Sequence, residues 1–210
     1  MQIIIASSNQ GKIKEIKKLL PSFETIPFKN IVGDIEIIED GNSFKDNAII
    51  KVKAIEKELR KINYNKSYII LADDSGISVP ALDNAPGIYS ARYAGENATD
   101  KTNNQKLLQE LQKKNLTKTD AFYTAAIAIL YKNNIYTTHG WMYGEVINQE
   151  KGENGFGYDP LFIPIGHNKT LGELTNDIKK DLSHRTKALN LMMIIINKLT
   201  SKNYKNVETL

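Results

Sequence analysis

Two adjacent carboxylates, Asp73 and Asp74, follow a run of apolar residues in the stretch IILADDSG at residues 69–76. Neighbouring carboxylates repel each other, and near the end of a buried strand their pKa values would rise unless a cation or a hydrogen-bond donor offset the charge. Together with Glu39, in IEDGNSFKDNAIIKVKA, they offer three hard oxygen ligands. Mg²⁺ is usually bound by such carboxylates together with substrate phosphates. We therefore expect Glu39, Asp73 and Asp74 to bind a magnesium ion together with a polyphosphate substrate.

A polar segment, ASSNQGKIKE at residues 6–15, follows the first apolar run of the chain. A strand that turns into a helix here would present free backbone N–H groups and the helix dipole to an anion such as phosphate. The segment is not a Walker A loop, because the Gly five residues before Gly-Lys and the Ser or Thr after it are missing, and it is not a Gly-rich dinucleotide fingerprint. Taken alone, Ser7, Asn9 and Lys12 also fit a turn, a helix cap and a solvated lysine.

Two later clusters have the residue types of a purine pocket. In GFGYD, residues 155–159, Phe156 offers a ring face for stacking, the flanking glycines allow close backbone approach, and Asp159 offers an acceptor. In SHR, residues 183–185, His184 and Arg185 join Lys179 as donors near a helix start, where cations oppose the helix dipole. Each cluster alone is also common without function.

The elements that must position these residues alternate between strand and helix patterns. Apolar runs predict strands at 2–6, 68–72 and 161–165, a shorter strand in GISVPAL after the acidic pair, and a hairpin of 121–131 and 135–147 with Asn133 and Asn134 in its turn. Helical spacing predicts helices from 13 to 20, from Ser43 to Arg60 and from about 100 to 114, and a last helix with Ser183 as its N-cap. The segment 83–100 reads as a long ordered loop. The fold class is α/β with a mixed sheet.

Composition sets the outer limits of the function. The 210 residues fit one globular domain over 1–210, and the absence of cysteine excludes disulfides and thiolate metal sites. The net charge of +4 is carried by scattered lysines, which favours solvated helix faces over a nucleic-acid surface. No run approaches the ~20 apolar residues of a membrane span. We expect a cytoplasmic protein that binds neither a membrane nor a nucleic-acid polymer.

The motifs SSNQGK, EDGNSFKDNAIIKVKA, ADDSGISVPALDNAPGIYSARYAG, GENGFGYDPLF and LSHRTKAL occur in this order. Together they resemble the Ham1 family of inosine/xanthosine triphosphate pyrophosphatases over most of the chain. Two departures stand out: Ser7-Ser8 replaces the Thr-Gly common in the family, and Ile178 replaces a frequent Glu. The first keeps a hydroxyl for phosphate, and the second changes local charge.

The resemblance implies a Mg²⁺-dependent homodimer that hydrolyses ITP, dITP and XTP to the monophosphate and pyrophosphate. It implies an elongated mixed sheet flanked by helices, with an active-site cleft between two lobes. Asp74 would be the base that activates water and would hold the metal with Glu39, with Asp73 as a further ligand. The implied substrate contacts are Ser7, Ser8, Asn9, Gln10, Gly11, Lys12, Lys51 and Ser75 at the phosphates or sugar, and Phe156, Gly157, Tyr158, Asp159, Lys179, His184 and Arg185 at the base.

Two other classes of function remain open at this stage. A receiver-like domain also combines an acidic pair, Mg²⁺ and a later lysine, but it would be shorter and would leave GFGYD and SHR without a role. A nucleotide- or RNA-binding module without hydrolase activity would fit the basic pI of about 9.0 and the ten tyrosines. Its binding to a polymer would be sensitive to salt.

Overall fold

The computed structural model describes residues 1–205, and their six strands form one mixed sheet in the order β2-β1-β3-β4-β5-β6. β1 pairs in parallel with β2 and β3, whereas β4, β5 and β6 each add an antiparallel partner. The strands are β1 (Gln2–Ile5), β2 (Glu24–Pro27), β3 (Tyr68–Ser78), β4 (Lys118–Tyr131), β5 (Asn134–Ile147) and β6 (Phe162–Pro164).

Helices cover both faces of this sheet. They are α1 (Gln10–Leu19), α2 (Lys29–Val32), α3 (Phe44–Lys61), α4 (Asp100–Lys113), α5 (Asn176–Leu182) and α6 (His184–Lys205), with short 3₁₀ helices η1 (Pro80–Leu82), η2 (Gly87–Arg92) and η3 (Asp159–Leu161). The expectation of a mixed sheet flanked by helices is confirmed. No helix within residues 1–205 combines the length and the apolarity needed to cross a bilayer.

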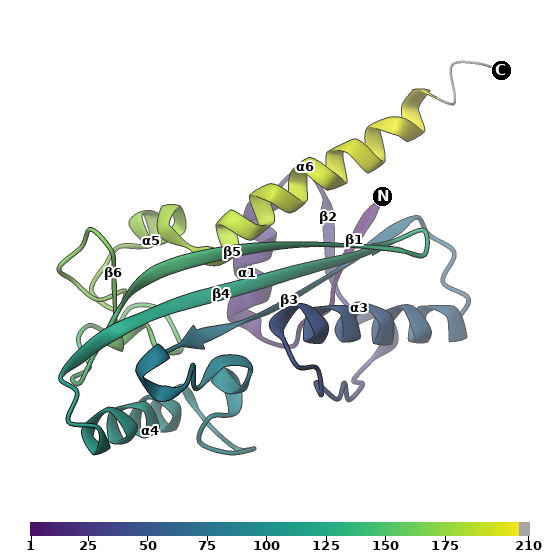
Figure 1. The fold of residues 1–210 in the computed structure, drawn as a ribbon. Helices are drawn as coiled ribbons and strands as arrows, with labels where there is room; N and C mark the ends of the chain where they lie inside the picture. Colours follow the sequence, from purple (N-terminus) through teal and green to yellow (C-terminus); the bar gives the residue numbers. More distant parts are fainter. Residues whose placement is uncertain (206–210) are drawn as a thin grey trace.

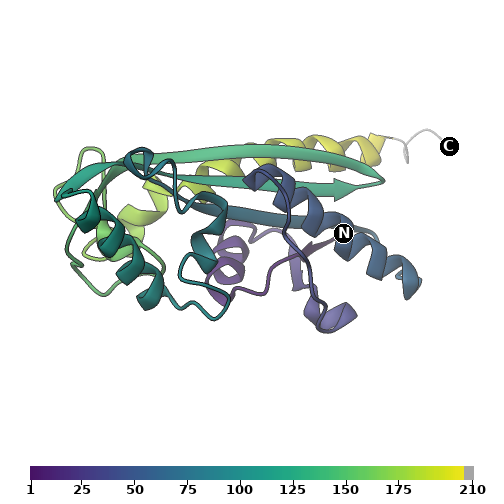
Figure 2. The same ribbon diagram turned by 60° about the horizontal axis from the view of Figure 1, so that its bottom comes forward.

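The molecule is elongated because β4 and β5 are 14 residues each, a length of about 45 Å for an extended strand. Figure 1 shows α6 running along this hairpin, with α3 across the sheet from it. In Figures 1 and 2 alike, α4 lies at one end of the long axis and the C-terminal half of α3 at the other.

The two helical layers follow from the alternation of side chains along the strands. Ile3 and Ile5 of β1 pack with buried residues of α1 and α6, whereas Ile4 between them packs with Ala48, Val52 and other residues of α3. A third apolar cluster joins α4 to the far ends of β3, β4 and β5. The first cluster thus packs α1 and α6 against one face of the sheet, and the cluster around Ile4 packs α3 against the other.

Helix starts follow the capping chemistry expected from the sequence. Ser43 accepts a hydrogen bond from the N–H of Asp46 at 3.1 Å, and Asn9 accepts one from the N–H of Lys12 at 3.0 Å. The predicted cap of the last helix is also present, since the Ser183 hydroxyl accepts from the N–H of Thr186 at 3.2 Å. These caps fix where α1, α3 and α6 begin, and all three helices begin beside the acidic pair or its partners.

Two sequence expectations are corrected. β3 continues through the acidic pair to Ser78, so GISVPAL is not a separate strand, and its second half forms η1. The hairpin turn consists of Lys132 and Asn133, both at positive φ, and Asn134 already belongs to β5. In α6, residues 188, 192 and 196 are buried, whereas Leu191 and Ile194 are 50% and 66% exposed.

Candidate active site

The acidic pair lies in the middle of β3, where Asp73 and Asp74 pair with Ile127 and Ala126 of β4. Because neighbours in a strand point to opposite faces, the two carboxylates cannot share one set of partners. The Asp74 side chain meets α3, and the Asp73 side chain meets α1 and α6. The sheet thus separates two carboxylates that are adjacent in sequence.

Asp74 belongs to a charged cluster built on α3. The Lys51 ammonium donates to Asp74 Oδ1 at 2.8 Å, to the Asp73 carbonyl at 3.2 Å and lies 2.9 Å from Glu39 Oε2, while the Asn47 amide donates to Asp74 Oδ2 at 3.2 Å. Burial, together with repulsion by Glu39, raises the pKa of Asp74 although Lys51 opposes the shift. A carboxylate with a raised pKa is suited to accept a proton near neutral pH.

Asp73 is held by two cations on the other face. Its Oδ2 lies 2.6 Å from Lys12 Nζ, and its Oδ1 accepts from Arg185 Nε at 3.3 Å. Burial alone would raise the pKa of Asp73, but Arg185 and Lys12 outweigh it and hold that pKa well below its usual range. The Arg185 guanidinium also donates to the Ser75 hydroxyl at 2.9 Å and forms an ion pair with Glu15. Asp73 therefore anchors α1 and α6 to β3.

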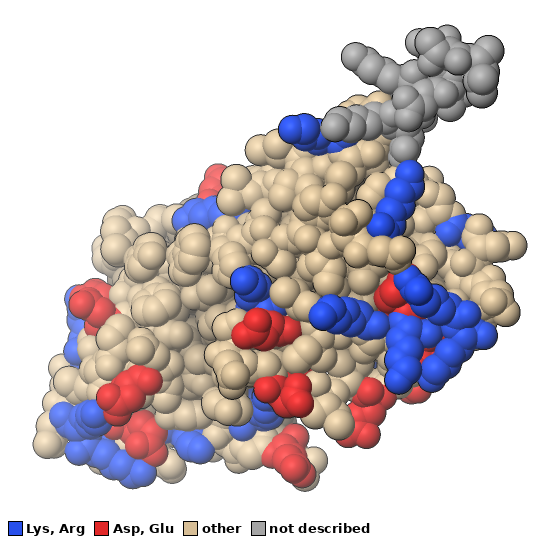
Figure 3. All heavy atoms as spheres, turned by 45° about the vertical axis from the view of Figure 1, so that its right-hand side comes forward, with Lys and Arg blue, Asp and Glu red and all other residues tan. Residues whose placement is uncertain are grey.

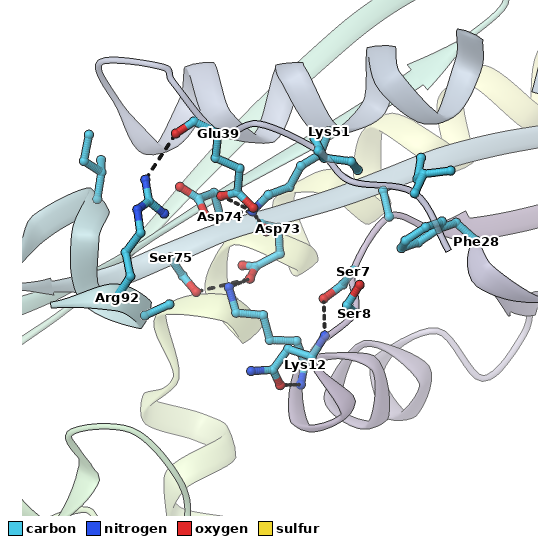
Figure 4. A pocket seen from close by; sticks show the side chains of 16 residues that line it. Ser7, Ser8, Lys12, Phe28, Glu39, Lys51, Asp73, Asp74, Ser75 and Arg92 are labelled. Atoms are coloured by element: carbon cyan, nitrogen blue, oxygen red, sulfur yellow. Dashed lines mark hydrogen bonds and ion pairs between the residues drawn. The ribbon is translucent and has the colours of Figure 1, made fainter. Parts of the chain in front are cut away.

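A cavity of about 260 Å³ opens above these charges, between the β1–α1 turn, β3 and η2. Figure 4 shows the side chains of Lys12, Ser7 and Ser8 on one side of it, Arg92 on the other, and Glu39, Lys51 and Asp74 between them. The N-terminus of α1 faces this cavity, since Ser7, Ser8 and Asn9 also line it. The arrangement can bind a multiply charged anion.

A second cavity of about 450 Å³ adjoins the first through the ion pairs of Arg185, which lines it together with Phe156, Asp159, Lys179 and His184. Asp159 Oδ2 lies 2.6 Å from Lys179 Nζ. A side chain at position 155 would place its Cβ 1.9 Å from Asp159, so glycine is required there for this pair to form. The Phe156 ring is 43% exposed, and the Arg185 guanidinium lies 5.9 Å from its centroid.

His184 occupies the first position of α6 in this second cavity. Its ring stacks on Tyr123 with centroids 4.8 Å apart, and within residues 1–205 its Nδ1 has no hydrogen-bond partner. Burial, reinforced by Arg185, holds the pKa of His184 well below its ordinary value of 6.5. The imidazole is therefore neutral at neutral pH and offers a hydrogen bond without adding charge.

The structure brings most of the predicted site residues to these two cavities. Three line neither: Gln10 is exposed at the start of α1, Gly157 donates its N–H to Asp100 at 2.7 Å, and the Tyr158 hydroxyl is buried and donates to the Ser90 carbonyl at 2.8 Å. The remaining predicted residues lie at one cavity or the other, and Gly11 lies at the second beside the Phe156 ring.

The metal site predicted from three carboxylates is not formed. No group of three or more metal-binding side chains occurs within the described part of the chain, because Asp73 faces away from Glu39 and Asp74 and is neutralised by Lys12 and Arg185. Glu39 and Asp74 remain on one cavity, joined through Lys51. Two carboxylates are a sufficient protein contribution for a cation that also binds substrate phosphates.

Sequence reasoning missed Glu15 and Arg92. Glu15 lines the second cavity and accepts from Arg185 and from the Ser183 hydroxyl, the latter at 3.1 Å. In the sequence it reads as part of the solvated face of an amphipathic helix. Arg92 lines the first cavity from η2, within a segment that carries no periodicity. Neither residue has a local signal, because its partners are distant in sequence.

Comparisons with known proteins agree with this geometry. The profile of the Ham1 family matches residues 3–195. A protein named dITP/XTP pyrophosphatase from Aliarcobacter butzleri is 61% identical over 93% of this chain and 98% of its own length, and one of the same name from Sulfurimonas denitrificans is 53% identical over 95% and 100%. The solved structure of the Staphylococcus aureus Ham1 protein superposes with a TM-score of 0.81 at 38% identity, covering 94% of this chain and 99% of that one. By sequence and by fold, the chain belongs to the Ham1 family.

Proposed function

We propose that this protein hydrolyses dITP, ITP and XTP to the nucleoside monophosphate and pyrophosphate, and so removes deaminated purines from the nucleotide pool. The observation that carries this proposal is the joining of two cavities by one ion-pair network: Lys12 and Asp73 line the first, and Arg185 lines the second. The first cavity has the charges for a polyphosphate. The second has the aromatic and polar groups for a purine.

The phosphates are bound at the N-terminus of α1 and by two lysines. The turn at Ser7–Lys12 offers hydroxyl groups and backbone N–H groups, and the ammonium groups of Lys12 and Lys51 lie on opposite faces of β3. Burial lowers the pKa of Lys12 against the attraction of Asp73. A phosphate beside Lys12 would raise that pKa again. Positioning and charge neutralisation of this kind supply most of the catalysis in phosphoryl transfer.

A divalent cation completes the site, and we assign it as Mg²⁺. Glu39 and Asp74 would hold it, since both carboxylates line the cavity and both form an ion pair with Lys51. When bound, the metal neutralises charge on the phosphate oxygens. Asp74 also orients the attacking water and accepts its proton, a role that its raised pKa favours.

Purine selectivity arises at the start of α6. Arg185 and Lys179, two of the residues expected to contact the base, already bind Asp73 and Asp159, respectively. His184 and Arg185 are in the first turn of α6, where backbone N–H groups have no carbonyl partner within the helix. Both residues line the cavity, so these N–H groups can donate to a base. A carbonyl at position 6, as in hypoxanthine and xanthine, accepts from such donors. The amino group of adenine cannot, which costs about 1–3 kcal/mol.

The chain also presents a surface suited to a homodimer, which we propose as its assembly. Phe122, His139, Trp141 and Tyr143 share one face of the β4–β5 hairpin, where the Phe122 and Tyr143 rings are 5.9 Å apart and the His139 and Trp141 rings stack at 5.7 Å. Trp141 and Tyr143 are 43% and 57% exposed. Sedimentation velocity should give a dimer, and Trp141→Glu should shift it towards monomer. A monomeric wild type would contradict the proposal.

A polymer-binding module without hydrolase activity is the competing function. On the face drawn in Figure 3, basic and acidic side chains are interspersed and do not form one uniform basic stripe.

We place the protein in the cytoplasm, where the nucleoside triphosphate pool lies.

The test is steady-state pyrophosphate release from dITP, ITP, XTP, GTP and ATP, with Mg²⁺ and with EDTA. The proposal predicts rapid release from the first three, slow release from ATP and loss with EDTA. Binding of RNA without hydrolysis of any nucleotide would favour the competing module.

A further inference from the structure

Arg92 is the last residue of η2 and lines the phosphate cavity opposite Lys12 and Ser7 (Figure 4). Of the two cavities described above, Arg92 lines the phosphate cavity, and the base-binding cavity lies on the other side of the Asp73–Arg185 pair. A nucleotide whose base occupies the second cavity would therefore extend its phosphates towards Arg92. The end of the polyphosphate chain farthest from the base would lie nearest to it.

The charge of Arg92 is unusual for this site. Lys12 is paired with Asp73, and Lys51 is paired with both Glu39 and Asp74. Arg92 has no carboxylate within ion-pair distance among the described residues; its contacts are a hydrogen bond from Nη2 to the Glu39 carbonyl at 3.1 Å and the Tyr89 ring at 5.2 Å. Of the five guanidinium donors, most are therefore free. This cation can bind an anion without breaking an existing ion pair.

The segment that carries Arg92 is fixed to the sheet. The Ser90 hydroxyl donates to the Gly87 carbonyl at 2.6 Å and accepts from the N–H of Ile77 in β3 at 3.0 Å. The Ser90 carbonyl accepts from the Tyr158 hydroxyl, and Lys106 Nζ donates to the Tyr93 carbonyl. Because these bonds hold η2 on both sides of Ser90, the guanidinium is supported at the rim of the cavity before any ligand binds.

We propose that Arg92 binds the terminal phosphate of the substrate and makes the enzyme prefer nucleoside triphosphates to diphosphates. The inference rests on the proposed function, because it assigns the end of the same phosphate site. The planar guanidinium matches two phosphate oxygens at once, which a lysine cannot do. The contact is present with a triphosphate or with the pyrophosphate product, and a diphosphate or a monophosphate is too short to make it.

The experiment compares Arg92→Gln and Arg92→Lys with wild type. It measures kcat/KM for dITP and dIDP, and the inhibition constants of inorganic pyrophosphate and of dIMP, all with Mg²⁺. Lys101→Gln is the control for the loss of one positive charge, because Lys101 is exposed in the first turn of α4 and does not line the cavity. Thermal unfolding of each variant checks that the fold is kept.

In Arg92→Gln the inhibition constant of pyrophosphate should rise about 10- to 100-fold, the range expected for a lost charge-assisted contact. The dITP-to-dIDP ratio of kcat/KM should fall by a similar factor, the dIMP constant should stay within about twofold, and Arg92→Lys should recover part of the loss. Lys101→Gln should match wild type.

An unchanged pyrophosphate constant in Arg92→Gln, or an equal rise for dIMP, would overturn the assignment, the second by showing a merely structural role. A wild type that releases no pyrophosphate from dITP would instead contradict the proposed function. The role of Arg92 could then still be read from calorimetric titration of wild type and variant with magnesium pyrophosphate.

Discussion

Gly140 on β5 allows the backbone of α6 to approach the sheet closely beside the base-binding cavity. A Cβ at this position would lie 2.2 Å from the His184 carbonyl oxygen and 2.7 Å from the Ala188 nitrogen, both of them backbone atoms of α6. Relief of the first contact alone requires a displacement of about 1 Å. Gly140→Ala should therefore lower the free energy of unfolding by about 1–3 kcal/mol, the usual effect of overpacking.

The same displacement moves the first turn of α6, which carries His184 and Arg185. A misplacement of about 1 Å in groups that position a substrate can reduce kcat/KM by up to about 10²-fold. We expect a reduction of that order for dITP, measured by steady-state pyrophosphate release. Urea unfolding followed by circular dichroism gives the stability of the same sample.

Gly144→Ala is the matched control on the same face of β5. Its Cβ would lie 2.2 Å from the Ile163 carbonyl oxygen, so the steric conflict is equal, but it involves β6 and not α6. This variant should lose similar stability and retain most of its kcat/KM. If Gly140→Ala kept wild-type kinetics while losing stability, the close approach of α6 to β5 would not position the base-binding residues.

Two further predictions concern single side chains. Asp74→Asn should reduce kcat by about 10²–10⁴-fold, the usual contribution of a positioned general base, with an unchanged fold by circular dichroism; retention of more than about a tenth of kcat would place the base elsewhere. In the native state the pKa of His184 lies well below its ordinary value of 6.5. Below that pH the unfolded chain therefore binds a proton that the native state excludes, and the free energy of unfolding should fall as the pH drops. The slope approaches about 1.4 kcal/mol per pH unit for one proton. His184→Phe, compared with wild type by urea unfolding from pH 7 to 5, should show a shallower slope, and parallel curves would refute the assignment.

The elements with strong local patterns could be predicted from the sequence. The long hairpin follows from two apolar runs joined by a short polar turn, and α3 follows from Ser43 as a cap and from Ala48, Val52 and Ile55 at helical spacing. The two-residue repeat of a strand also predicts that the side chains of Asp73 and Asp74 point to opposite faces of the sheet. That prediction requires the strand to continue through both residues, as β3 does.

The ion-pair network at the centre of the site had no such local signal. Glu15 meets Arg185 across 170 residues of sequence, and Arg92 reaches the cavity from a segment without periodicity. A charged residue on an amphipathic helix is indistinguishable in sequence from one that faces solvent. Only the packing of α1 and α6 on one face of the sheet brings Glu15, Asp73 and Arg185 together.

Hydrolysis of dITP in ¹⁸O-labelled water tests the central claim most directly. If the site directs water to the α-phosphorus, pyrophosphate and dIMP form in equal amounts, and mass spectrometry finds the label in dIMP alone. Release of orthophosphate with dIDP as the other product, or label in pyrophosphate, would show cleavage at a different phosphorus atom and would contradict the assignment of the two cavities.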